Sequence, residues 1–336
     1  MKARAVLVPC LVFVMMAALV SGCRGEDDSI TVYVGRSANL VGPLLEDFAE
    51  DTGIKIRVRY GDGTDLALGI LEEGDNSPAD VYYGQDVGAL GALKAENRLA
   101  PLSQETLEKV DPAFRSPDGL WVGVSGRARV IVYNTDRIDP AGLPDSILDY
   151  VAPKWKGKVG VVPRSDGFPE FVTALRVTKG EEFARQWLES LASNNARAYA
   201  NNISAIQAVA NGEIEVAFLN HYYLYRFLAE RGDSFKARNY YFDNGDLGGL
   251  FLVSGAAVLE TSKQKDKAEK FVQYLLSPKA QQHFAEFDHE YPLVEGTAVD
   301  PNLPPLSTLQ APEIDLSDLG DLRGSLKLLQ ETGVLP

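Results

Sequence analysis

The sequence has almost no cysteine. Of its 336 residues, only Cys10 and Cys23 are cysteine, and both lie near the N-terminus. Beyond Cys23 the chain can form no internal disulfide, offers no thiol nucleophile and holds no metal through cysteine. Its stability must therefore come from the burial of apolar side chains in a core.

Histidine is also scarce, and the three present are His221, His283 and His289. The sequence lacks the Gly-x-Ser-x-Gly elbow, the Walker loop, the His-Glu-x-x-His zinc motif and Gly-x-Gly-x-x-Gly. These absences predict that the chain is not an enzyme. The alternative is a hydrolase that works through scattered carboxylates, and it would need catalytic groups converging in a cleft.

Positive charge is in deficit. Lysine and arginine together number 33 against 47 aspartates and glutamates, which gives a formal net charge of −14. This balance argues against nucleic-acid binding, which requires a basic surface. An acidic surface favours the approach of a cation, but it also serves ordinary solubility.

The first residues are typical of a secretory leader. Lys2 and Arg4 precede an apolar run over residues 5–20. The Val20-Ser-Gly-Cys23 stretch resembles the bacterial lipobox, whose cysteine is acylated. The sequence thus predicts a signal peptide over residues 1–22, lipidation of Cys23, a tether over residues 23–29 and an extracytoplasmic, lipid-anchored protein. The alternative is an ordinary secretory peptide that contains a cysteine by chance.

The remaining chain predicts an α/β protein with two lobes. Strands alternate with helices from residue 30 to about residue 93, which indicates a parallel sheet covered by helices. The run Gly126–Asn134 predicts a strand that crosses to a second α/β unit, and Gly248–Leu259 predicts a strand that returns. We expect residues 30–129 and 253–303 to form one lobe and residues 130–252 and 304–336 the other. The ligand cleft of such a protein lies between the lobes, at the carboxyl ends of the strands.

A cluster of aromatic residues follows one predicted strand of the second unit. Asn220, His221, Tyr222 and Tyr223 come directly after the strand Ile214–Leu219. Aromatic residues at a strand end often only pack against the core. A bound trivalent cation would instead favour the charged form of a phenol strongly enough to expel its proton. The resulting phenolates are hard anionic oxygens, which suit ferric iron better than zinc or copper(I).

Several stretches resemble the ferric-ion-binding solute-binding proteins of bacterial iron importers, and the likeness covers nearly the whole chain after the leader. The stretches that carry it are residues 30–35, 77–83, 125–130, 205–213, 220–223, 248–257 and 290–293. The resemblance implies the type II periplasmic-binding-protein fold, with a mixed sheet in each lobe. It also implies that Tyr222 and Tyr223 bind Fe(III) and that the partner is an ABC permease. We expect a monomer.

The first lobe departs from the family pattern. Ser37 occupies the place of a histidine and Gln85 the place of a glutamate, while Asp86 follows one residue later. We therefore expect Ser37, Gln85 and Asp86 to contribute weakly, with water or an anion completing the metal shell. A different ligand, such as a phosphonate, thiamine or another oxyanion, is the alternative.

The same resemblance implies a synergistic anion, carbonate or phosphate, beside the metal. The matching residues are Ser165, Asp166, Gly167, Asn202 and Asn220. Residues 165–167 and Asn202 precede predicted helices, whose free amides attract anions. Asn202 alternatively serves only as the cap of its helix. We expect Arg36 to face the anion or Asp166 across the cleft, although a solvated arginine is the alternative.

Overall fold

The structure is a computed structural model, and it describes residues 29–164 and 167–335. The predicted signal peptide, the lipidated Cys23 and the predicted anion-binding residues Ser165 and Asp166 lie outside these ranges. Within the ranges, no helix is both long enough and apolar enough to cross a bilayer.

Helices and strands alternate along the chain, as the sequence predicts. The strands are β1 (Ser29–Gly35), β2 (Lys55–Tyr60), β3 (Val81–Gly84), β4 (Val122–Asn134), β5 (Val159–Val161), β6 (Arg197–Ala198), β7 (Val216–Asn220), β8 (Ala237–Tyr240), β9 (Phe251–Val258) and β10 (Tyr291–Pro292). The helices are α1 (Ala38–Thr52), α2 (Gly63–Glu73), α3 (Gly88–Ala95), α4 (Gln104–Leu107), α5 (Phe168–Lys179), α6 (Glu181–Ser193), α7 (Asn202–Ala210), α8 (Tyr223–Arg231), α9 (Lys265–Leu275), α10 (Pro278–Glu286) and α11 (Leu322–Glu331).

The strands form one mixed sheet in the order β2-β1-β3-β9-β4-β7-β5-β6, and β8 and β10 pair with β4 beside this path. We call the part built on β1, β2 and β3 the first lobe and the part built on β5, β6 and β7 the second lobe. The strands pair in parallel within each of these sets. Parallel strands place the loops that follow them at one edge, so each lobe presents a row of strand-end loops.

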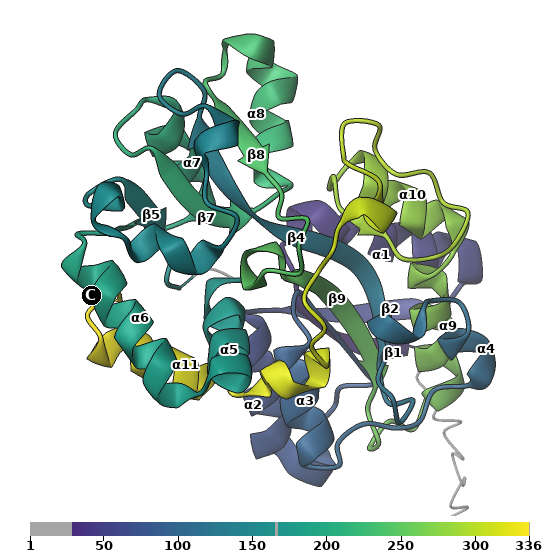
Figure 1. The fold of residues 1–336 in the computed structure, drawn as a ribbon. Coiled ribbons are helices and arrows are strands. Elements are labelled where there is room, and N and C mark those ends of the chain that lie inside the picture. The colour runs from purple at the N-terminus through teal and green to yellow at the C-terminus, as the bar shows by residue number, and fades with distance from the viewer. Residues whose placement is uncertain (1–28, 165–166, 336) are drawn as a thin grey trace, which may run out of the picture.

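The long strand β4 joins the two lobes (Figure 1). It pairs with β9 as far as Ala128 and with β7 from Arg129 onward. All 13 of its residues are buried, and it begins at Val122, four residues before the crossing strand that the sequence predicts. We propose that the lobes divide along β4 at this change of partner, close to the expected division between residues 129 and 130.

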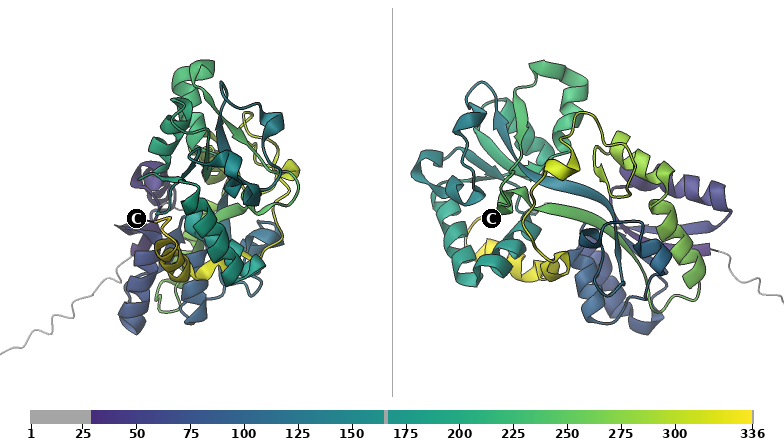
Figure 2. Two further views of the ribbon diagram at one scale, coloured as in Figure 1. Left: turned by 60° about the vertical axis from the view of Figure 1, so that its left-hand side comes forward. Right: turned by 45° about the vertical axis from the view of Figure 1, so that its right-hand side comes forward.

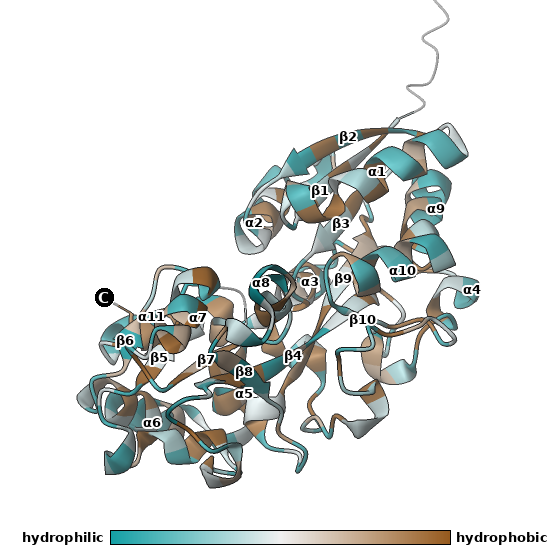
Figure 3. Cartoon of the chain, turned by 90° about the horizontal axis from the view of Figure 1, so that it is seen from above, coloured by the Kyte–Doolittle hydropathy of each residue, from teal (hydrophilic) through white to brown (hydrophobic). Residues whose placement is uncertain are grey.

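Amphipathic helices cover the sheet of the first lobe. The helix α1 buries Val41, Leu44, Leu45 and Phe48 against it. Figure 3 shows this arrangement from above, with hydrophilic residues on the outer face of the helix. Such burial is the main stabilising contribution, at roughly 25 cal/mol for each Å² of apolar surface removed from water.

The C-terminal segment contacts both lobes (Figure 2). The short turn η9 (Leu316–Gly320) lies so close to α3 that a Cβ atom added at Gly88 would come 2.8 Å from the carbonyl oxygen of Leu319. On the other side, Arg176 of α5 pairs with Asp321 at 2.8 Å. The segment therefore links the lobes in addition to β4 and β9.

Candidate metal centre

The strand-end loops of the two lobes face each other across a cavity of about 350 Å³. The loops after β1, β2 and β3 line it from the first lobe, and the turn after β7 lines it from the second. The lining side chains that carry side-chain oxygen atoms are Ser37, Tyr60, Asp62, Gln85, Tyr222 and Tyr223. The predicted cleft residues Ser37, Gln85, Tyr222 and Tyr223 therefore share one cavity.

The two tyrosines lie at a strand-to-helix junction. The strand β7 ends at Asn220, Tyr222 immediately precedes α8, and Tyr223 is the first residue of that helix. Their ring centroids are 4.3 Å apart, with 32° between the ring planes. Tyr222 is only 4% exposed, and burial together with the neighbouring Tyr223 holds its pKa well above the usual value near 10. The Tyr222 side chain is therefore a neutral phenol until a strong cation displaces its proton.

His221 plays a structural part. Its Nδ1 accepts a hydrogen bond from the backbone amide of Ala128 at 3.2 Å, and its Nε2 lies 2.8 Å from the carbonyl oxygen of His289. This arrangement requires the neutral ring with the proton on Nε2. Burial lowers the pKa of His221 to about 4, so the ring stays neutral and fixes the turn that presents the tyrosines.

The first lobe places its three expected metal ligands differently. Ser37 is exposed and lines the cavity, as does the buried Gln85. Asp86 is buried but does not line the cavity, and its Oδ1 accepts the Ala89 amide at 3.2 Å near the start of α3. Burial raises the pKa of Asp86. Its carboxyl group thus stabilises the start of α3.

Arg36 lines the cavity, but its guanidinium group is paired inside the first lobe and is not a solvated side chain. Arg36 forms a bidentate pair with Glu290 at 2.9 and 3.1 Å and also donates to Ser254 at 2.9 Å. Asp288 lies 3.5 Å away, and the side chains of this cluster are buried. The charge of Arg36 is neutralised inside the first lobe because burying it without a carboxylate partner would be unfavourable.

The predicted anion-binding residues come from two helix starts and one strand end. Gly167 caps α5 with φ +101°, and its amide donates to Glu170 at 2.5 Å. Asn220 accepts from Arg129 at 3.0 Å, and a Cβ atom added at Gly167 would come 2.8 Å from both Asn220 and Arg129. Glycine is therefore required where these groups meet, and Glu170 already accepts a hydrogen bond from the Gly167 amide.

Asn202 does not cap its helix. It is the first residue of α7, and the cap is Asn201, whose side-chain oxygen accepts the Ser204 amide at 2.9 Å. The sequence offers two adjacent asparagines, either of which would suit the position. The alternative interpretation of Asn202 as a helix cap is thus wrong by one residue.

Two buried arginines near the cavity were not anticipated. Arg127 donates to the backbone carbonyl of Gln85, while its Nε and Nη2 have no hydrogen-bond partner among the described residues. Burial lowers the pKa of Arg129 to about 10, which leaves it charged at neutral pH. The sequence could have indicated this pair, because residues two apart in a strand point to the same face of the sheet.

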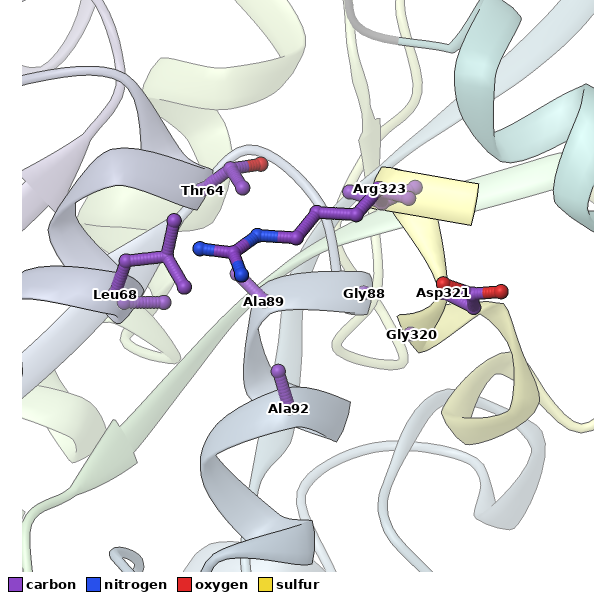
Figure 4. A pocket seen from close by; sticks show the side chains of 10 residues that line it. Thr64, Leu68, Gly88, Ala89, Ala92, Gly320, Asp321 and Arg323 are labelled. Atoms are coloured by element: carbon purple, nitrogen blue, oxygen red, sulfur yellow. The ribbon is translucent and has the colours of Figure 1, made fainter. Parts of the chain in front are cut away.

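A second cavity, of about 100 Å³, lies between α2, α3 and the start of α11 (Figure 4). Its walls are mostly small or apolar, and Arg323 extends over them from α11. Asp321, at its edge, pairs with Arg176 and caps α11. This cavity lacks the convergent oxygen atoms of the cleft.

Comparisons with known proteins agree with the fold. The family described as "Bacterial extracellular solute-binding protein" matches residues 76–317. The "Major ferric iron-binding protein" of Neisseria meningitidis serogroup A is 36% identical over 96% of this chain and 98% of its own length. The "Fe(3+)-binding periplasmic protein" of Serratia marcescens is 33% identical over 96% of this chain and 95% of its own length.

A solved structure supports the same relationship. Iron-bound HitA from Pseudomonas aeruginosa superposes with a TM-score of 0.84 and 39% sequence identity, covering 91% of this chain and 99% of that one. The resemblance and the two-lobed α/β fold expected from the sequence are therefore confirmed. The chain belongs to the bacterial extracellular solute-binding protein family.

Proposed function

We propose that this protein captures Fe(III) outside the cytoplasm and delivers it to an ABC permease. The main observation behind this proposal is that two adjacent phenols, Tyr222 and Tyr223, line a cavity between the lobes. The names of the relatives from Neisseria and Serratia support ferric iron as the ligand over a phosphonate, thiamine or other oxyanion.

Capture requires no chemical transformation, in keeping with a binding protein and not an enzyme. Fe(III) displaces the phenolic protons and binds the two phenolate oxygens, which are hard donors that match a hard cation. Contacts from the first lobe then favour the closed arrangement, because a ligand shifts a conformational equilibrium only through its stronger interaction with one state. The permease would recognise the closed form.

Iron binding is expected to weaken as the pH falls. Each tyrosine that becomes a phenolate releases one proton, so two tyrosines make the affinity change by up to about 100-fold per pH unit. The test is titration of the metal-free protein with ferric citrate at several pH values, followed by visible absorbance and by proton release. An absent charge-transfer band, or an affinity independent of pH, would contradict phenolate binding.

A synergistic anion would complete the site, and Arg127 supports its presence. A buried guanidinium with unpaired N–H groups is unfavourable unless a ligand satisfies them. Carbonate or phosphate would accept these hydrogen bonds beside the metal. Burial raises the pKa of Tyr222, whereas the positive charge of Arg127 lowers it, which supports a position of the arginine close to the tyrosine pair.

Replacing Arg127 by methionine is therefore expected to remove most of the dependence of iron affinity on carbonate or phosphate. The gain in iron affinity that the anion provides should fall by about tenfold or more, since hydrogen bonds to charged groups contribute ~1.5–3 kcal/mol. The measurement compares iron affinity with and without added anion. Arg57→Met, on an exposed part of β2, is the control. Equal anion dependence in the wild type and the Arg127→Met variant would refute a role for Arg127.

We also propose that Cys23 carries the lipid that anchors the protein to the outer face of a membrane, and that the protein acts as a monomer. The lipobox-like Val20–Cys23 stretch supports the anchor. The family supports the ABC permease as partner.

A further inference from the structure

The cleft holds an acidic side chain that the family pattern does not anticipate. A trivalent hard cation needs anionic oxygen donors, and the second lobe offers two phenols. On the first-lobe side, Ser37 carries a neutral hydroxyl and Gln85 a neutral carboxamide. Among the described residues that line the cavity, Asp62 is the one carboxylate.

The turn that carries Asp62 is fixed at the correct edge of the sheet. The amide of Gly61 donates to the carbonyl of Val34 at 3.3 Å, and the amide of Gln85 donates to the carbonyl of Gly35 at 3.2 Å. A Cβ atom added at Gly35 would come 2.8 Å from the Cα atom of Gly63. The close approach of these two glycines therefore brings Asp62 beside the loops that carry Ser37 and Gln85.

One oxygen of Asp62 has a structural role, which leaves the other for a ligand. Its Oδ1 accepts the amides of Thr64 at 3.0 Å and Asp65 at 3.3 Å and so caps α2. Both of these bonds are made to Oδ1, so Oδ2 can bind a cation without disturbing the cap.

The remaining first-lobe candidate, Tyr60, lines the cavity, but its hydroxyl group lies at the side next to α1. Its hydroxyl lies beside α1, since a Cβ atom added at Gly42 would meet it at 3.9 Å. The Tyr60 phenol is thus poorly placed to bind the metal opposite Tyr222 and Tyr223.

We propose that Asp62 is the first-lobe ligand of the metal and bridges to Tyr222 and Tyr223 when the lobes close, an inference that rests on the proposed binding of Fe(III). Two phenolates and one carboxylate together carry three negative charges, which balance the charge of Fe(III). Asp62 thereby supplies the negative charge that the neutral side chain of Gln85 lacks. It also gives the metal an attachment in each lobe.

The test replaces Asp62 by asparagine, which keeps the shape and caps a helix about as well as aspartate. Asp65→Asn is the matched control, because it removes the same charge three residues later, in the first turn of α2 and outside the cavity lining. Iron affinity, measured by competition with citrate, is expected to fall by at least the ~10–100-fold that follows loss of a metal's outer-shell partner. The charge-transfer band should persist but move to longer wavelength, since iron with one anionic donor fewer is more electron-poor.

The outcomes separate this inference from the function on which it rests. If wild-type protein shows no charge-transfer band with ferric citrate, the proposed function itself fails. If the wild type shows the band and Asp62→Asn matches it in affinity and wavelength, Asp62 is not a ligand and only this inference fails. Equal losses of iron affinity in Asp62→Asn and Asp65→Asn would mean that only the negative charge near the cleft matters. That result would also overturn the inference that Asp62 is a ligand.

Discussion

Substituting phenylalanine for Tyr222 or Tyr223 is expected to remove most of the iron affinity, and substituting both is expected to abolish the visible ferric–phenolate band. Each change deletes one hard anionic donor from the metal and leaves an apolar ring edge in its place. The loss should exceed the ~10–100-fold typical of outer-shell substitutions, because a direct ligand is removed. Visible absorbance during titration with ferric citrate measures both the band and the affinity.

Tyr225→Phe is the control for this prediction. Tyr225 lies on the same helix, but its hydroxyl bonds to Tyr241 at 3.2 Å and to the carbonyl of Asn302 at 3.1 Å, and it does not line the cavity. The control variant should keep the full band. Retention of the band in the Tyr222→Phe, Tyr223→Phe double variant would show that iron binds elsewhere or not at all.

The architecture was accessible from the sequence because local patterns determine it. The alternation of short apolar strands with amphipathic helices predicts a sheet covered by helices, and the long apolar run before Asn134 predicts the crossing strand. The tyrosine pair was also accessible, because its position directly after a strand places it at the carboxyl edge of the sheet. These features depend only on neighbouring residues.

The roles of charged residues depended on contacts between distant parts of the chain. Arg36 lines the cavity, but no local pattern indicates that Glu290, which is 254 positions away in the sequence, binds its guanidinium. Asp86 and Asp62 both follow strands of the first lobe, and only the three-dimensional arrangement shows that Asp62 lines the cavity. Nothing in the local sequence distinguishes a carboxylate that caps a helix from one that also faces a ligand.

Arg36→Met is expected to destabilise the protein by about 3–5 kcal/mol, the range for breaking a buried ion pair by removing one partner. The change leaves Glu290 and Asp288 buried without the guanidinium group that pairs with them. Burial raises the pKa of Asp288 to about 7, so this carboxyl carries its charge at pH 8 far more than at pH 6. The loss of stability should therefore be larger at pH 8, as measured by urea unfolding at the two pH values.

A double variant distinguishes the ion pair from a simple packing defect. Combining Arg36→Met with Glu290→Gln removes both charges of the bidentate pair, and it should recover part of the lost stability because no ionised Glu290 remains buried alone. A packing defect would instead make the two losses add. If Arg36→Met unfolds at the same urea concentration as the wild type but binds iron without its dependence on anions, the guanidinium belongs to the cleft after all, and the assignment of Arg36 to the core of the first lobe is wrong.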